Sequence, residues 1–109
     1  MSKLSPPSTL IMEGVLCKQR SSAFGGWNKR FFSLDSQGLH YRREHATSGS
    51  DSLPPSSTID LTKGKYFRVS KLNPLAIEIV TSSRTYVLLA DNVRDRNLWM
   101  QGLGVWQKL

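Results

Sequence analysis

The hydrophobic period of the chain changes once, near residue 91, and this change limits the folds that it can adopt. Before that point, short runs alternate apolar and polar residues, as half-buried strands do, and Gly, Pro and Ser separate the runs. After it, apolar residues recur at helical spacing. The expected strands are residues 10–19, 27–35, 39–44, 58–61, 65–70, 75–81 and 85–90. The sequence predicts a mostly β domain of seven strands with one C-terminal α-helix and no internal repeat.

The segment that follows the last strand predicts a helix of about 15 residues from Val93 onward. Asp91 or Asn92 is the expected N-cap. The apolar residues that recur at intervals of four and then three are Trp99, Leu103 and Trp106. We expect this apolar face to pack against one open end or face of the sheets, rather than to serve as a groove for a partner.

The length of the chain indicates how many domains it forms, and its charge indicates what kind of partner it binds. The chain has 109 residues, which suits one small domain. We expect that domain to span residues 12–108, after a flexible leader over residues 1–11. Lys and Arg number 15 and Asp and Glu number 8, a net charge of +7. This excess predicts an anionic partner such as a membrane surface or a phosphate group, the alternative being a role in solubility alone.

The cysteine content and the apolar runs point to a cytoplasmic protein. Cys17 is the single cysteine, so the sequence contains no internal disulfide and no zinc cluster. No run of about 18 apolar residues is present, and residues 1–11 lack the apolar segment of a signal peptide. We therefore expect any membrane contact to be peripheral, and we expect no cofactor and no metal.

A basic cluster is expected where the first three strands meet. Arg30 has the same parity as the core residues Phe32 and Leu34, so it should point to the inner face of the sheet. Two antiparallel hairpins bring the late part of the first strand and of the third strand beside the early part of the second. The residues predicted to converge there are Lys18, Arg30, Tyr41 and Arg43. Their donors suit a polyanion, because guanidinium groups and ammonium groups bind phosphate; solvated basic side chains at a strand end are the alternative.

The loop after the first strand supplies further candidate contacts. Arg20 leaves that strand at the loop and is expected either to reach a phosphate or to be solvated. Ser22 and Asn28 are candidate contacts beside it. Phe24 is expected either to insert into the membrane interface or to pack on Trp27.

Several of these residues resemble the sequence pattern of the pleckstrin homology (PH) domain over about residues 12–108. The similar segments are EGVLCK, WNKRFFSL, LHYRR and the helix that contains Trp99. The residues that match the pattern in order are Gly14, Leu16, Lys18, Trp27, Arg30, Phe32, Leu34 and Trp99. The resemblance implies a partly open seven-stranded barrel or orthogonal sandwich, with sheets of four and three strands capped by the helix.

The same resemblance implies a ligand. Many PH domains bind phosphoinositides at the open end of the barrel, and Lys18 and Arg30 match the first and last basic residues of the motif of those that bind. Tyr41 stands where binders of 3-phosphorylated lipids often carry a Tyr that contacts phosphate. Asn28 replaces the middle basic residue, and Ser56 and Ser57 stand where some binders carry Arg. The resemblance thus implies a monomeric, non-catalytic module that recruits a larger signalling or trafficking protein to 3-phosphorylated lipids.

Other functions fit the sequence less well. A protein-interaction module on the same fold is the main alternative, with the Ser/Pro-rich loop of residues 45–57 or the fifth strand as contact surface. Nucleic-acid binding has the required charge but lacks aromatic residues arranged to stack bases. We do not expect a hydrolase, because the eight carboxylates are scattered and no Ser/His/Asp set or metal-binding spacing is present.

Overall fold

A computed structural model describes residues 9–20, 25–43 and 56–109. The described elements follow the order that the sequence predicts, seven strands and then one helix. Their bounds are β1 Leu10–Gln19, β2 Trp27–Asp35, β3 Gly38–Arg43, β4 Ser56–Ile59, the 3₁₀ turn η1 Leu61–Lys63, β5 Gly64–Val69, β6 Ala76–Thr81, β7 Thr85–Leu89 and α1 Val93–Gln107. The expected leader over residues 1–11 and the expected loop over 45–57 lie largely outside the described residues, although β1 starts at Leu10.

The fourth strand differs from its predicted position by two residues. It spans Ser56–Ile59 rather than residues 58–61, because Asp60 ends it and starts η1. The Asp60 side chain accepts a hydrogen bond from the Thr62 N–H, which is the geometry of a helix N-cap. Leu61, expected in the strand, is therefore buried from the 3₁₀ turn.

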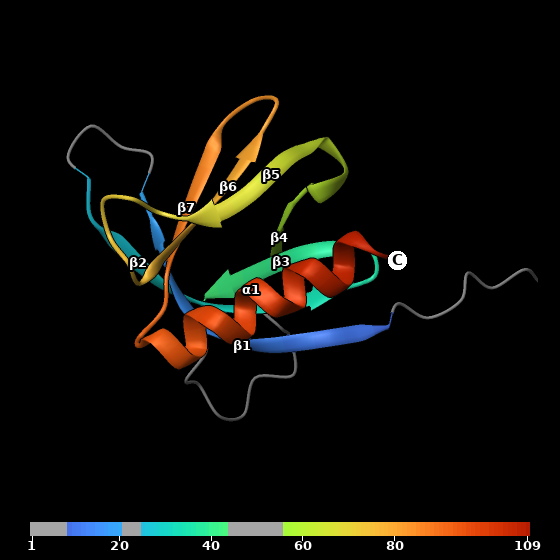
Figure 1. Ribbon diagram of the computed structural model, residues 1–109, viewed down its shortest axis with the longest axis horizontal. Helices are drawn as coiled ribbons and strands as arrows, with labels where there is room; N and C mark the ends of the chain where they lie inside the picture. The colour runs from blue at the N-terminus through green and yellow to red at the C-terminus, as the bar shows by residue number, and fades with distance from the viewer. Residues whose placement is uncertain (1–8, 21–24, 44–55) are drawn as a thin grey trace, which may run out of the picture.

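The strands form one antiparallel sheet in the order β4-β3-β2-β1-β7-β6-β5. β1 and β7 pair only at Cys17–Leu89 and Lys18–Leu88, so this short seam joins a four-stranded half to a three-stranded half. The two halves stand at an angle to each other in Figure 1. β4 and β5 are the two ends of the sheet, so the sheet is not closed into a barrel. This is the predicted division into four and three strands.

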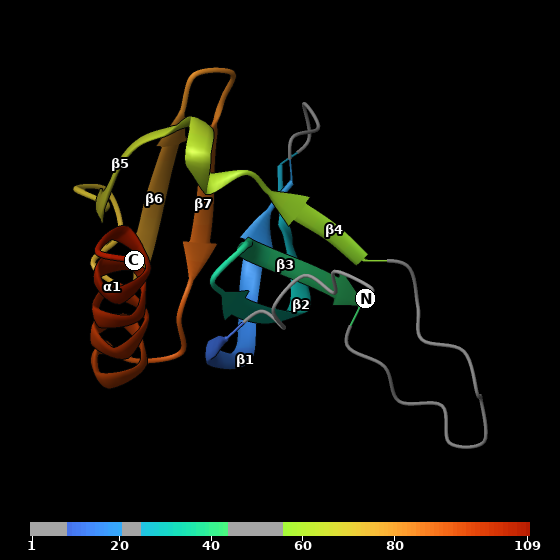
Figure 2. The same cartoon turned by 90° about the vertical axis from the view of Figure 1, so that its right-hand side faces the viewer.

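The helix lies on the side of the molecule away from β4, as Figure 2 shows. Asn92, one of the two predicted N-caps, accepts a hydrogen bond from the Asp95 N–H at 2.8 Å. Trp99 and Leu103 are buried in the core, and Trp106 packs against it. The Arg96 guanidinium donates to the Pro74 carbonyl at 2.7 Å, which ties α1 to the segment between β5 and β6.

The core forms from the inward parity of the strands. Phe32 is fully buried and contacts Trp99 edge to face, with ring centroids 6.4 Å apart. The remaining fully buried large side chains are Leu16, Leu34, Leu39, Ile59, Ile77, Ile79, Leu88 and Leu103. Gly102 lets α1 approach β1 closely, because a Cβ there would lie 2.5 Å from the Met12 sulfur. The helix therefore packs closely on the four-stranded half, because the large Trp99 ring contacts Phe32 and because Gly102 has no side chain to keep α1 away from Met12.

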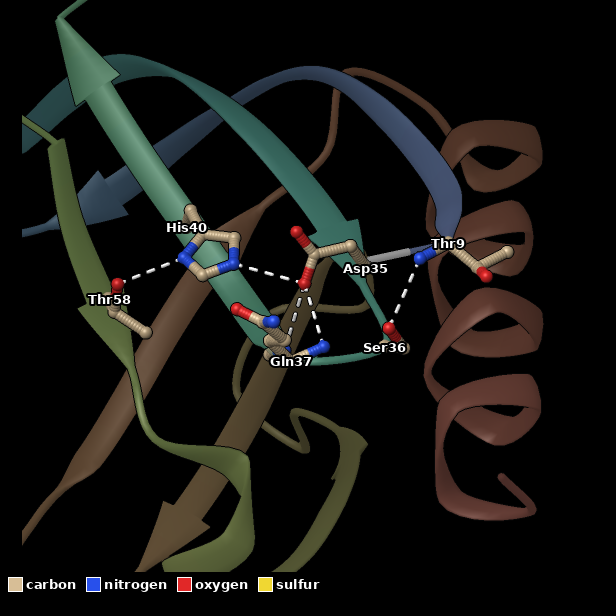
Figure 3. Close-up of polar contacts among 7 residues, drawn as sticks. Thr9, Asp35, Ser36, Gln37, His40 and Thr58 are labelled. Atoms are coloured by element: carbon tan, nitrogen blue, oxygen red, sulfur yellow. Dashed lines mark hydrogen bonds and ion pairs between the residues drawn. The ribbon is translucent and has the colours of Figure 1, made fainter. Parts of the chain in front are cut away.

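The tight turn between β2 and β3 is held by the Asp35 carboxylate (Figure 3). Asp35 accepts hydrogen bonds from the N–H groups of Gln37 and Gly38, and from His40 Nε2 at 3.1 Å. Partial burial pushes the pKa of Asp35 upward, but these hydrogen bonds outweigh it and hold that pKa below its ordinary value. His40 Nδ1 contacts the Thr58 hydroxyl at 2.9 Å, so the network also ties β4 to the turn.

Candidate anion-binding site

The strand register places the predicted basic residues at the seam between the two halves of the sheet. Lys18 lies opposite Asn28 of β2 on one side and opposite Leu88 of β7 on the other. Arg30 lies two residues after Asn28 on β2, on the same face, opposite Leu16 of β1 and Arg43 of β3. The inward parity predicted for Lys18 and Arg30 therefore agrees with the register, and their buried neighbours Leu16 and Phe32 lie deeper.

The Lys18 ammonium lies over two tyrosine rings. Its Nζ lies 5.4 Å from the ring centroid of Tyr41 and 5.8 Å from that of Tyr86. The Tyr41 ring in turn stacks on Phe32, with centroids 5.3 Å apart, so its position is fixed by the core. Partial burial lowers the pKa of Lys18, and the positive charges of Arg84 and Arg30 lower that pKa further.

Arg84 is a cation of this site that sequence reasoning missed. It follows Ser82 and Ser83 in the turn between β6 and β7, and its guanidinium lies over the Tyr86 ring, 4.2 Å from the centroid. The buried Thr81 hydroxyl shapes the turn, because it donates to the Arg84 carbonyl at 2.7 Å and accepts from the Arg84 N–H at 3.1 Å. Pairing of β1 with β7 then brings this turn close enough to Lys18 for the charge of Arg84 to act on it, although the two residues are far apart in sequence.

Two arginines lie opposite each other on β2 and β3. Arg30 and Arg43 are directly paired across the strands, an arrangement in which like charges repel. Arg30 Nη1 donates to the neighbouring Lys29 carbonyl at 2.8 Å, and Arg43 is exposed. Within the described ranges, no carboxylate forms an ion pair with Lys18, Arg30, Arg43 or Arg84. Among the described residues, no acidic side chain therefore pairs with these positive charges.

Asn28 orients another cation instead of adding one. Its Oδ1 accepts a hydrogen bond from Arg20 Nε at 3.0 Å. Arg20 directly follows β1, and this bond holds its guanidinium beside the start of β2. The Arg20 N–H donates to the Gly26 carbonyl at 2.9 Å and closes the base of the β1–β2 loop. Ser22 and Phe24 lie outside the described residues, so their predicted contacts stay predictions.

The side chains gathered at the seam are suited to binding an anion. In the described ranges, no group of three or more His, Cys, Asp or Glu residues is placed to hold a metal ion. None of the helices among the described residues has the length and apolar character needed to cross a bilayer. What converges at the seam is a set of ammonium, guanidinium and hydroxyl groups, and such groups bind oxyanions.

Comparison with known proteins identifies the family. The model of the PH domain family matches residues 10–104. The chain is 27% identical over 101 residues to human "Arf-GAP with coiled-coil, ANK repeat and PH domain-containing protein 3", covering 89% of this chain and 11% of that protein. It is 33% identical over 97 residues to diacylglycerol kinase eta of Drosophila grimshawi, covering 88% of this chain and 5% of that protein. The chain thus spans a small part of these relatives.

Solved structures show the same fold. The PH domain of human pleckstrin homology domain-containing protein family A member 5 aligns with a TM-score of 0.70 at 23% identity, covering 97% of this chain and 83% of that one. The C-terminal PH domain of pleckstrin, solved in complex with D-myo-Ins(1,2,3,5,6)P5, aligns with a TM-score of 0.69 at 23% identity, covering 90% of this chain and 95% of that one.

Proposed function

This chain belongs to the PH domain family, and we propose that it is a phosphoinositide-binding module that recruits a larger protein to membranes. The observation that carries the proposal is the group of cations at the seam of the sheet, where Lys18 is partly buried beside Arg30 and Arg84. Partly desolvated like charges repel one another, and an anion bound among them would offset that repulsion. A PH domain is a binding module and is not itself catalytic, so its role is to hold the ligand.

An inositol phosphate head group would bring the missing negative charge to the seam. The Lys18 ammonium and the Arg84 guanidinium would approach it from the β1–β7 side, and Arg30 and Arg43 from the β2–β3 side. The Arg30 guanidinium would exchange its contact with the Lys29 carbonyl for a fork onto phosphate oxygens. Arg20, held by Asn28, would contact the head group or a neighbouring anionic lipid from the loop.

We further propose that 3-phosphorylated lipids, phosphatidylinositol 3,4,5-trisphosphate or 3,4-bisphosphate, are the preferred ligands. Tyr41 supports this preference, since its ring lies beside Lys18 and is fixed by Phe32, so its hydroxyl can donate to a phosphate without loss of ring freedom. The pleckstrin C-terminal PH domain, which has the same fold, was solved in complex with inositol pentakisphosphates. That complex supports an inositol phosphate as the class of ligand.

The cellular role follows from the same proposal. A cytoplasmic protein with a net charge of +7 is attracted to the anionic inner surface of a membrane, by about 1 kcal/mol for each basic residue near that surface. Head-group binding then adds specificity to this attraction. The chain matches 11% of the length of one relative and 5% of another, which supports a larger protein as the parent. For that parent we propose a signalling or trafficking role, with the monomeric domain as the unit that binds.

Titration with soluble inositol phosphates tests this function. The ¹⁵N-labelled domain would be titrated with inositol 1,3,4,5-tetrakisphosphate and with inositol 1,4,5-trisphosphate, following backbone amide shifts. We expect shifts centred on Lys18, Arg30 and Arg84, and tighter binding of the 3-phosphorylated compound. Equal affinities would refute the preference for 3-phosphorylated lipids. If neither compound shifts those amides, the binding function itself is wrong.

A further inference from the structure

A single threonine closes the turn that carries Arg84. Thr81 is the last residue of β6 and is buried, whereas Ser82 and Ser83, at the tip of the turn, are exposed. The Thr81 N–H and hydroxyl both donate to the Arg84 carbonyl, at 2.9 and 2.7 Å, and the same hydroxyl accepts from the Arg84 N–H at 3.1 Å. Thr81 thus bonds both backbone polar groups of Arg84, which fixes the direction in which the Arg84 side chain leaves the turn.

The turn is also anchored to the neighbouring strand. The Ser82 N–H donates to the Lys63 carbonyl at 3.1 Å, and Thr81 pairs with Gly64, the first residue of β5. Because the backbone of the turn is bonded both to β5 and to the Thr81 hydroxyl, the exposed Arg84 side chain starts from a fixed point.

The aromatic ring of Tyr86 fixes the other end of the Arg84 side chain. The two residues are two positions apart in an extended segment, so their side chains project from the same side of it. The guanidinium lies 4.2 Å from the centroid of the ring. Tyr86 is half-buried and packs against the core, so the core sets the position of its ring. Attraction between the guanidinium and the ring restricts a side chain that is exposed to solvent.

The same ring also lies beside Lys18. Pairing of β1 with β7 brings the Lys18 Nζ within 5.8 Å of the centroid of Tyr86. Partial burial lowers the pKa of Lys18, and the charge of Arg84 lowers that pKa further, so the two cations repel each other. In the ranges that the structure describes, neither forms an ion pair with a carboxylate. The ring of Tyr86 attracts both cations and so offsets part of this repulsion.

We propose that Thr81 and Tyr86 are positioning residues, which hold Arg84 beside Lys18 so that both cations face the phosphate groups of the ligand. Thr81 acts on the backbone of Arg84 and Tyr86 acts on its guanidinium, and neither touches phosphate. An arginine that is already oriented loses less side-chain freedom when the ligand binds, so more of its attraction to phosphate contributes to the affinity. This inference rests on the proposed function and deepens it.

Calorimetric titration of the full chain with inositol 1,3,4,5-tetrakisphosphate tests the role of the ring. Tyr86→Leu should lower the affinity by about fivefold or more, because Arg84 loses the group that orients it. Tyr86→Phe keeps the ring and should bind within about twofold of the wild type. Tyr66→Leu is the matched control, because Arg68 lies over the Tyr66 ring in the same way, 5.3 Å from its centroid, but pairs with Glu78. This variant should bind as the wild type does.

Thr81→Val tests the turn, since it replaces the hydroxyl by a methyl group of similar size. It should lower the affinity by about threefold or more, whereas Thr81→Ser, which keeps the hydroxyl, should bind within about twofold of the wild type. Hydrogen exchange of the Arg84 amide should be faster in Thr81→Val than in Thr81→Ser, because that amide loses its acceptor.

A double-mutant cycle shows whether the ring acts through Arg84. When Arg84→Gln is already present, Tyr86→Leu should lower the affinity by less than about twofold. In the free protein, ¹⁵N relaxation of Arg84 Nε should show motion of larger amplitude in Tyr86→Leu than in Tyr86→Phe.

The results separate this inference from the binding function on which it rests. If the wild type binds the compound and Tyr86→Leu binds it as tightly, the inference alone is overturned. It is also overturned if Tyr86→Phe loses as much affinity as Tyr86→Leu, or if Tyr86→Leu has its full effect beside Arg84→Gln. If the wild type does not bind the compound, the binding function is wrong and this inference falls with it.

Discussion

Lys18 and Arg84 face the same space from opposite halves of the sheet, and the charge of Arg84 lowers the pKa of the Lys18 ammonium. Lys18 belongs to the strand that joins the halves, and Arg84 belongs to the turn between β6 and β7. The Lys18 ammonium and the Arg84 guanidinium both lie over the aromatic ring of Tyr86. The seam of the fold is thus also where its positive charge concentrates.

The first prediction concerns the pKa of Lys18. Arg84→Gln removes a neighbouring positive charge, so the pKa of Lys18 should rise in the free protein. Inositol 1,3,4,5-tetrakisphosphate should raise it in the wild type for the same electrostatic reason. The pKa is measured from the ¹³Cε shift of Lys18 as pH is varied. Because binding favours the charged form, the affinity should fall as pH rises through the lowered pKa.

Arg42→Gln is the matched control for that titration. It also removes one positive charge, but Arg42 has the opposite parity to Tyr41 and stacks on the Phe31 ring, 4.8 Å from its centroid. We expect the pKa of Lys18 to stay as in the wild type. A rise of the same size in Arg42→Gln and Arg84→Gln would show that net charge, and not the seam geometry, sets that pKa.

The second prediction concerns the Tyr41 hydroxyl. Tyr41→Phe keeps the ring that stacks on Phe32 and lies beside Lys18, so the free energy of unfolding should change by less than about 0.5 kcal/mol. The affinity for inositol 1,3,4,5-tetrakisphosphate should fall by about three- to tenfold, because one hydrogen bond to phosphate is lost. Calorimetric titration measures this change. An unaltered affinity would remove Tyr41 from the proposed site.

The third prediction concerns stability in acid. The hydrogen bonds of the β2–β3 turn hold the pKa of Asp35 below its ordinary value. A depressed carboxyl pKa contributes stability that is present above the unfolded value, about pH 4, and is lost as pH falls through the folded value. Asp35→Asn should therefore be less stable than wild type at pH 7, and that difference should shrink progressively as pH falls below about 4, as measured by urea unfolding.

Asp91→Asn controls for the loss of a negative charge in that experiment. Asp91 is exposed and lies just before α1, far along the chain from the turn. Its substitution should leave the pH dependence as in the wild type. A stability gap between Asp35→Asn and wild type that stays constant from pH 7 to pH 2.5 would contradict the assignment.

The fourth prediction concerns the glycines of α1. A Cβ at Gly102 would lie 2.5 Å from the Met12 sulfur, whereas a Cβ at Gly104 would meet nothing within 4 Å. Gly104→Ala should stabilise the domain by up to about 1 kcal/mol, through helix propensity alone. Gly102→Val should destabilise it by about 1–3 kcal/mol, because the larger side chain forces α1 away from Met12. Thermal unfolding of both variants measures the difference; equal effects would exclude a close packing role for Gly102.

The placement of the basic residues, though not their role, could be predicted from local patterns in the sequence. Parity and hairpin direction were sufficient to bring Lys18, Arg30, Tyr41 and Arg43 to one end of β1–β3, because a tight turn after Asp35 fixes the register of β2 and β3. The order of strands and helix was predictable for the same reason, because each element depends on neighbouring residues. The helix N-cap could be narrowed to Asp91 or Asn92, and the structure shows Asn92.

The parts that could not be predicted depend on pairing between distant residues. Arg84 reaches Lys18 only because β7 pairs with β1, about 70 residues earlier in the chain, and no local pattern encodes that contact. The buried Thr81 hydroxyl then directs the turn that carries Arg84. The surroundings of Trp106 escaped prediction similarly, since helical spacing assigned that residue to the core without showing that its indole N–H has no acceptor among the described residues.

The central claim is that the cations at the seam bind phosphoinositide head groups. Sedimentation with liposomes that contain phosphatidylinositol 3,4,5-trisphosphate tests it most directly, with Arg30→Ala compared with Arg42→Ala. Both variants lose one positive charge, but Arg30 faces the seam and Arg42 the other side of the sheet. We predict that Arg30→Ala loses at least about tenfold in affinity and that Arg42→Ala binds nearly as the wild type does. If Arg30→Ala binds these liposomes as tightly as the wild type, the proposed site is wrong.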